Sequence, residues 1–241
     1  MKKLQRFSAY IFDKESYEAI MTAIDSNWEK LVYTYIVVEG GWEFTSEEVN
    51  KAFKCKNLTD LVIRARLGRL LTECRSNIIC SNIASLCLSK CNIEEDPMEV
   101  LGNLASLKRL CFHSGSFLSE RMTCPASSFP CLKSFELDEL QNLKELIVDQ
   151  HAMPLLSRLH IRRCVEMEMV PEGLSAISSL QDLIIEGTPE LESRVKAING
   201  DGEEGEDFHK VRHVKITFKY YVLSSLVMLL PLLTFFSNTL V

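Results

Sequence analysis

Two features that would point to nucleotide chemistry or nucleic-acid binding are missing from these 241 residues. None of the ten glycines is followed by Lys-Ser or Lys-Thr, so the G-x-x-x-x-G-K-[ST] loop that cradles nucleotide phosphates is absent. The net charge is −6, whereas a nucleic-acid partner favours a basic face. The sequence therefore predicts no nucleotide cofactor and no nucleic-acid partner.

Paired cysteines and a leader sequence are also missing. The nine cysteines are an odd number, spread from Cys55 to Cys164 without a C-x-x-C pair, which argues against a disulfide framework. From Met1-Lys2-Lys3 the chain continues into polar and aromatic residues rather than into the apolar core of a signal peptide. We therefore expect a reducing compartment and a cytoplasmic location.

Histidine is scarce, and its spacing predicts no catalytic or metal site. His209 and His213 lie four residues apart but lack the glutamate of the zinc motif H-E-x-x-H. Cys111 and His113 are expected to point outward together from one strand, as a nucleophile and its base could. A shallow open face offers such a pair no oxyanion donors, so we predict no enzyme activity, no cofactor and no metal.

What the sequence does contain is a repeated apolar phrase. Ile83-x-x-Leu86-x-Leu88-x-x-Cys91-x-Ile93 fills every position of the leucine-rich-repeat template. The same core starts again at Leu107, Leu132, Leu156 and Leu180, at spacings of 24, 25, 24 and 24 residues. A repeat this short cannot bury its own apolar face and must stack on its neighbours. The pattern predicts an α/β leucine-rich-repeat solenoid (horseshoe) with a parallel concave sheet.

Weaker copies extend the array in both directions. Upstream we assign Leu4-x-x-Phe7-x-Ala9, Trp28-x-x-Leu31-x-Tyr33 and Leu58-x-x-Leu61-x-Ile63, and downstream Val211-x-x-Val214-x-Ile216. The total is nine strands, with irregular repeats over 1–82 and regular repeats over 83–218. The named apolar residues are expected to point inward and the residues between them outward.

The convex side is expected to hold short helices or extended returns. Residues 45–53 predict a helix that begins with a capping box of Thr45 and Glu48, and residues 14–24 predict a second helix. The stretch 140–148 instead indicates an extended return. Cys91 and Cys164 occupy the N/C position of the template, where we predict a structural side chain bonded to a turning backbone.

Two segments near the C-terminus differ from the repeats. Residues 199–207 are acidic and glycine-rich, which indicates a surface loop. Residues 220–241 carry no charge and are long enough for a hydrophobic C-terminal helix that spans a bilayer, with four basic residues just upstream. Pro231 and several polar residues weaken that interpretation, and the alternatives are a final buried strand that continues into an apolar cap, or a tail of no function. If the membrane interpretation is right, residues 222–241 tether the repeats on the cytosolic side.

Residues 83–218 resemble the C-terminal leucine-rich-repeat region of plant disease resistance proteins of the coiled-coil, nucleotide-binding, leucine-rich-repeat class. The resemblance is carried by Phe129–Leu137, Leu143–Pro154, Leu159–Cys164, Val170–Leu174 and Leu180–Leu183, and by His209–Val214. It implies a region that senses a pathogen-derived or host protein, or contacts other receptor domains, in plant defence. The nucleotide-binding and coiled-coil domains of that family are missing here, so we expect a truncated receptor or a fragment.

The concave face is the predicted binding surface. The candidate contact residues are Lys108, Arg109 and His113; Lys133, Glu136 and Asp138; Arg158, His160, Arg162 and Arg163; Asp182 and Glu186; and Arg212, His213 and Lys215. The alternative is an ordinary solvated surface of mixed charge with no binding role. Together with the resemblance, these residues predict a protein-interaction module; the alternatives are a membrane-anchored adaptor or decoy and a non-functional receptor fragment.

The tail interpretation gives a first prediction. If residues 220–241 span a bilayer, Leu229→Arg places a charge near the midplane, costs about 3 kcal/mol of insertion, and moves the protein into the soluble fraction of a membrane preparation. Pro231→Leu, which restores a helix former, should strengthen anchoring. A wild-type protein that carbonate already washes from membranes would contradict the anchor.

Overall fold

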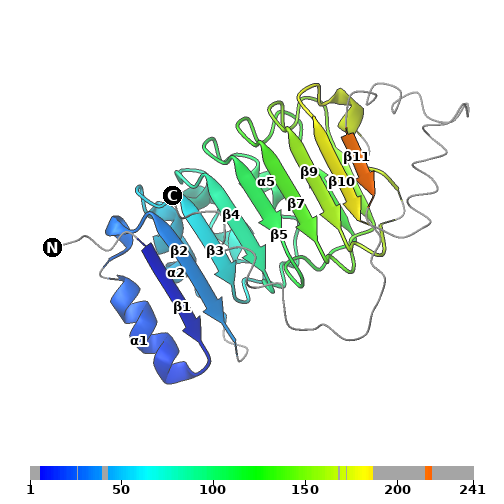
Figure 1. Ribbon diagram of the computed structural model, residues 1–241. Coiled ribbons are helices and arrows are strands. Elements are labelled where there is room, and N and C mark those ends of the chain that lie inside the picture. Colours follow the sequence, from blue (N-terminus) through cyan, green and yellow to red (C-terminus); the bar gives the residue numbers. More distant parts are fainter. Residues whose placement is uncertain are drawn as a thin grey trace, which may run out of the picture.

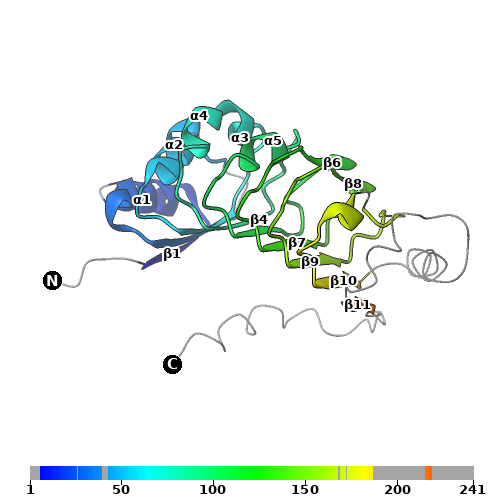
Figure 2. The same ribbon diagram turned by 90° about the horizontal axis from the view of Figure 1, so that it is seen from above.

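The computed structural model describes residues 6–25, 27–39, 43–167, 169–171 and 173–186, together with the backbone of 215–218. Within these residues the chain winds repeatedly between two layers (Figures 1 and 2). One layer is a long parallel sheet, and the other consists of short helices followed by a second small sheet. We call the face of the main sheet opposite the helices the concave face, and the side with the helices the convex side.

The main sheet contains nine strands in chain order, β1-β2-β3-β4-β5-β7-β9-β10-β11, and each neighbouring pair is parallel. Their bounds are β1 Arg6–Ile11, β2 Tyr33–Val38, β3 Asp60–Arg64, β4 Ser85–Ser89, β5 Arg109–Phe112, β7 Ser134–Asp138, β9 Arg158–Arg162, β10 Asp182–Glu186 and β11 Lys215–Phe218. This arrangement confirms the predicted solenoid and its nine strands.

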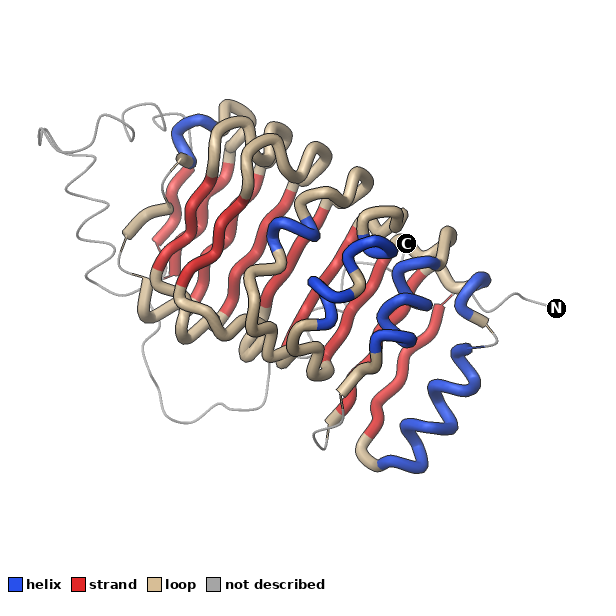
Figure 3. The backbone as a smooth tube through the Cα atoms, turned by 180° about the vertical axis from the view of Figure 1, so that it is seen from behind, coloured by secondary structure: helices blue, strands red, loops and turns tan. Residues whose placement is uncertain are grey.

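The convex side changes character along the chain (Figure 3). Its helical part comprises α1 Lys14–Asp25, η1 Trp28–Lys30, α2 Ser46–Lys54, α3 Leu70–Glu73, α4 Arg75–Ile78 and α5 Met98–Leu101, and η2 Leu174–Ala176 follows later. Between them, β6 Arg121–Cys124 pairs in parallel with β8 Glu145–Val148 as a second sheet. The extended return predicted over 140–148 is therefore present as β8.

The two longer helices form where their sequences predict them. Thr45 Oγ1 accepts from Glu48 N, and the Glu48 carboxylate accepts from Thr45 N at 2.7 Å, so the capping box of α2 is complete. The same carboxylate accepts the hydroxyl of Tyr17 at 2.6 Å, which joins α1 to α2. Burial and this hydrogen bond raise the pKa of Tyr17. Because Met21 and Ile24 are buried beneath α1, this helix covers the first strands.

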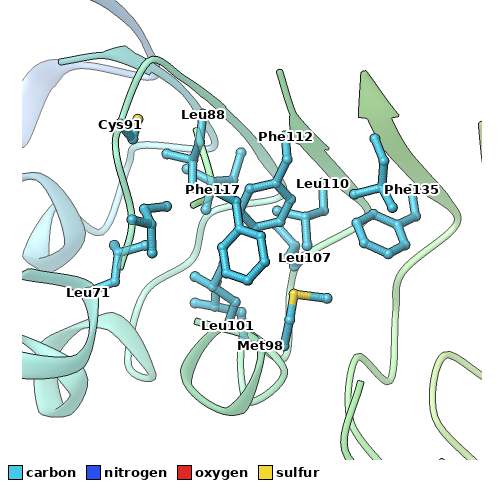
Figure 4. Close-up of a cluster of buried hydrophobic side chains, with 14 of the residues drawn as sticks. Leu71, Leu88, Cys91, Met98, Leu101, Leu107, Leu110, Phe112, Phe117 and Phe135 are labelled. Atoms are coloured by element: carbon cyan, nitrogen blue, oxygen red, sulfur yellow. The ribbon is translucent and has the colours of Figure 1, made fainter. Parts of the chain in front are cut away.

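The core is one continuous apolar cluster that runs the length of the described solenoid. Most strands from β2 to β10 of the main sheet contribute two inward residues; Leu86 and Leu88 on β4 and Leu159 and Ile161 on β9, for example, are at most 1% exposed. Figure 4 shows the middle of this cluster, where residues from α5 and from the strands interleave. Phe112 and Phe135, on neighbouring strands, meet edge to face with ring centroids 6.5 Å apart.

Two strands are displaced from their predicted register. β2 pairs Thr34 with Leu61 and Ile36 with Ile63, so its inward residues are Thr34 and Ile36 rather than Leu31 and Tyr33. Trp28 belongs to a 3-10 helix instead. At the other end, β11 pairs Ile216 with Leu183, two residues later than the Val211 phrase predicts. The error at β2 follows from choosing the more apolar phrase, because Thr34 is polar yet fully buried.

Several expectations concern residues outside the described part. They are the loop at 199–207, and the tail at 220–241 with its hydrophobic C-terminal helix. Within the described residues, none of the helices combines the length and apolar character needed to cross a bilayer.

The alternation of inward and outward residues gives a second prediction. Leu159→Ala removes a fully buried side chain from β9 and should lower the free energy of unfolding by roughly 2–5 kcal/mol. Its neighbour on the same strand, Arg158, is exposed, and Arg158→Ala should change this energy by no more than about 0.5 kcal/mol. Urea unfolding of both variants measures the difference, and equal losses would contradict the assigned strand phase.

Candidate protein-interaction surface

The register of the sheet arranges the outward side chains of the concave face into rows. The central row runs from strand to strand through Tyr35, Val62, Cys87, Cys111, Glu136, His160 and Ile184. Its residues come from different repeats, about 24 positions apart in the chain, yet they face one another across single strand spacings. The β2–β4 part of this row is uncharged, and charge appears from β7 onward.

Cross-strand ion pairs join the charged strands. Glu136 on β7 lies between two guanidinium groups: Arg109 Nη2 on β5 is 3.9 Å from Oε2, and Arg162 Nη1 on β9 is 3.6 Å from Oε1. Arg162 Nη2 also donates to His160 Nδ1 at 3.2 Å, and His160 Nε2 lies 3.7 Å from Asp182 Oδ2 on β10. The centre of the concave face is thus a connected polar network from β5 to β10.

A shorter ion pair stands at the carboxyl ends of the strands. Arg163, just after β9, places Nη2 2.6 Å from both carboxylate oxygens of Asp138 on β7. Arg163 adopts φ 50°, a turn conformation that sets its side chain beside the neighbouring strand. Burial raises the pKa of Asp138, and the nearby guanidinium only partly offsets this effect. Arg163 therefore stabilises a negative charge on Asp138 at a buried position that disfavours this charge.

The amino-terminal edge of the same strands is different. Lys108, Arg109, Lys133 and Arg158 lie at or just before the starts of β5, β7 and β9, and all four are exposed. Within the described part of the chain, no ion pair engages Lys108, Lys133 or Arg158. We call these four residues the basic edge. It presents positive charge to solvent beside a centre whose charges already have partners.

The remaining predicted contact residues differ in burial and in position. Asp138 and Glu186 are buried, at 9% exposure each, so little of either side chain is accessible to a partner. His113 directly follows β5 and is half-buried. Lys215 starts β11 opposite Asp182 in the backbone register, while Arg212 and His213 lie outside the described residues.

A second cluster on the concave face contains Cys111 and His113, which the sequence predicts to point outward together, and also Cys87, which the sequence analysis did not identify. Cys87 on β4, Cys111 on β5 and His113 offer sulfur and nitrogen atoms that all lie within 4.8 Å of one another. A hydrogen bond from Cys87 lowers the pKa of the Cys111 thiol, and the pKa of Cys87 is raised in turn. The signal was present: both cysteines occupy the same outward position of the phrase, one repeat apart.

Two other cysteines have the structural role predicted for them. Cys91 Sγ donates to the carbonyls of Ser89 at 3.3 Å and Ile63 at 3.6 Å, and Cys164 Sγ makes the same kind of contact with Arg162 at 3.4 Å. Burial raises the pKa of Cys91 to about 12 and that of Cys164 to about 11. Both remain neutral thiols that hold the turns after their strands.

The Asp138–Arg163 pair gives a third prediction. Arg163→Gln leaves a buried carboxylate without its strongest partner and should cost about 1–3 kcal/mol of unfolding free energy. Adding Asp138→Asn should restore stability to within about 1 kcal/mol of wild type, because the burial cost of the charge disappears as well. Urea unfolding of the two single variants and the double variant measures the coupling. Strictly additive losses would show that the pair contributes nothing as a pair.

Comparison with known proteins agrees with this architecture. A family model described as a leucine-rich repeat region matches residues 1–214. Disease resistance RPP8-like protein 3 of Arabidopsis thaliana is 37% identical over 133 residues, which are 55% of this chain and 14% of that protein. Disease resistance protein RPP8 of the same plant is 38% identical over 133 residues, again 55% and 14%.

A third relative matches over more of the chain. Disease susceptibility protein LOV1 of Arabidopsis thaliana is 29% identical over 214 residues, which are 89% of this chain and 22% of that protein. The chain therefore spans between 14% and 22% of the length of these three relatives. The chain belongs to the leucine-rich repeat region family, and it resembles that part of plant disease resistance proteins.

Proposed function

We propose that this chain is a protein-interaction module of the plant defence response, which binds a protein through its concave face. Its similarity to disease resistance proteins supports the biological setting. The parallel sheet supports the mode of binding, because stacked repeats present an extended and rigid surface rather than a closed pocket. A binding role of this kind requires no catalytic group, and we propose none.

The observation that carries the proposal is the contrast between the basic edge and the centre of the face. The central charges are paired across strands, so a partner gains little net energy from them and meets a fixed pattern of polar groups. Lys133 and Arg158 in the basic edge are exposed and have no ion-pair partner among the residues that the structure describes. A complementary partner segment would therefore carry acidic groups and lie across the starts of β5, β7 and β9.

The cysteines support a reducing compartment, the cytoplasm, as the place where this function is performed. All nine lie in the described part of the chain and are present as thiols. Several of them, including Cys91 and Cys164, use the thiol proton in hydrogen bonds that a disulfide would remove. Attachment to a membrane through 222–241 is compatible with the same binding face and stays a prediction.

A fourth prediction tests the binding face. The full chain carries a photo-reactive amino acid at Ser134, which lies in register with Arg109 and Arg158, and is irradiated in extracts of infected leaf tissue. A second preparation carries the same group at Lys54, on the convex side. We expect a protein that is captured from Ser134 and not from Lys54. Its affinity for the wild-type chain is then measured with both proteins purified.

Charge reversal on the two sides provides the matched comparison. Lys133→Glu with Arg158→Glu should weaken binding by about tenfold or more, and the loss should shrink as salt is added. Lys54→Glu with Lys56→Glu makes the same change in net charge at exposed positions at the end of α2 and in the turn after it, and should change Kd by less than about twofold. Equal weakening by both pairs, or capture that does not distinguish Ser134 from Lys54, would reject the concave face as the binding surface.

A further inference from the structure

The cluster of Cys87, Cys111 and His113 stands at a defined place in the solenoid. Cys87 is the central residue of β4, and it pairs in register with Cys111 on β5. The residues on either side of each cysteine, such as Leu86 and Leu110, are fully buried in the core. Strand alternation therefore sends both sulfurs to the concave face, where adjacent parallel strands hold them side by side.

His113 joins the two cysteines because the chain continues in register just beyond β5. Its backbone N–H donates to the carbonyl of Leu88 at 2.8 Å, which keeps the residue against β4. The ring is hydrogen-bonded to Cys111, yet Nε2 is buried and makes no hydrogen bond to any described residue. A buried ring nitrogen without a partner is costly and needs an explanation.

We propose that Cys87, Cys111 and His113 form a binding site for a thiophilic metal cation, with Zn²⁺ as its most suitable occupant. Two thiolates and one imidazole are a common ligand set for zinc, and bond lengths near 2.3 Å to sulfur and 2.0 Å to nitrogen place tetrahedral ligand atoms roughly 3.5–3.8 Å apart. The three ligand atoms lie within 4.8 Å of one another without an ion. Side-chain rotations that move these atoms by about one ångström would bring them to the separations of a tetrahedral site.

The type of ligand selects the type of cation. Sulfur and imidazole nitrogen favour soft or borderline ions, whereas calcium and magnesium require a shell of oxygen atoms. Three protein ligands leave a fourth tetrahedral position. Glu136 on β7 is in register with Cys111, and its Oε2 lies 4.0 Å from Cys111 Sγ. This carboxylate is near enough to fill the fourth position or to hold a water molecule there.

Hydrogen bonds already connect the three side chains of the cluster. The Cys87 thiol donates a hydrogen bond toward Cys111, and His113 and Arg109 also stabilise negative charge on Cys111. A bound cation would replace the protons that now connect the three side chains. The inference stands on this cluster alone and is independent of the proposed protein partner.

The fifth prediction is a metal titration of the full chain. Protein purified under reducing conditions is stripped with a chelator and titrated with Co²⁺, whose thiolate complexes absorb in the near ultraviolet and whose tetrahedral complexes absorb strongly in the visible. We expect one equivalent of Co²⁺ to produce both bands and Zn²⁺ to displace it. Zn²⁺ should also raise the midpoint of thermal unfolding, because it binds the folded chain.

Variants separate this site from adventitious binding to other thiols. Cys111→Ser and His113→Ala should each weaken the metal by about 100-fold or more, since even outer-sphere changes cost 10- to 100-fold at such sites. Cys80→Ser removes an exposed cysteine outside the cluster and should leave the affinity unchanged. Circular dichroism confirms folding, and His113→Ala keeps both thiols in case a cysteine variant unfolds.

Three results would overturn the proposal. The first is the absence of a cobalt–thiolate band at one equivalent. The second is a band that persists in both Cys111→Ser and His113→Ala. The third is a Cys87–Cys111 disulfide that forms in air at the same rate with and without saturating Zn²⁺, because a metal bound to both sulfurs must slow that oxidation.

Discussion

The register between neighbouring parallel strands is the constraint on which the rest of this molecule depends. A repeat of about 24 residues has one short strand and one return, too little to enclose a core. Its two inward residues are buried only because those of the next repeat lie beside them, as Leu86 and Leu88 lie beside Leu110 and Phe112. Slipping one strand by one residue would exchange its buried and exposed faces. Apolar burial therefore fixes the register, and the register fixes everything on the outer face.

Register converts a spacing in the sequence into contacts on the concave face. Glu136 and Arg109 are 27 residues apart in the chain, and Glu136 and Arg162 are 26 apart, yet each pair forms an ion pair across one strand spacing. Cys87 and Cys111 meet for the same reason. No local motif records these pairs, because the members of each pair lie a whole repeat apart in the sequence. The repeat period itself is the motif.

Much of the fold could be predicted because the residues that recur as apolar in the repeated phrase are, in most repeats, the residues that are buried. The predicted position of β2 was wrong because a polar residue, Thr34, is fully buried there. The more apolar Trp28, which opened the predicted phrase, lies outside the sheet. With Leu31 opening the second phrase, the first two spacings become 27 and 27 residues instead of 24 and 30. On the concave face, the alternation of inward and outward residues along each strand identified the outward side chains. It could not distinguish exposed Arg158 from buried Asp138, because Asp138 is covered by its ion-pair partner Arg163 from the next repeat.

The two kinds of charge on this face have different physical consequences. Glu136, Arg162 and the Asp138–Arg163 pair are held by their neighbours, so in the proposed complex they would already be ordered and would disfavour partners whose charges do not match. Lys108, Lys133 and Arg158 of the basic edge are exposed to solvent, so the attraction they exert depends on salt. In the proposed complex, Lys133 and Arg158 would attract an acidic partner toward the sheet, and the paired charges at the centre would determine whether that partner fits. Both properties arise from one face because stacking leaves that face open along its whole length.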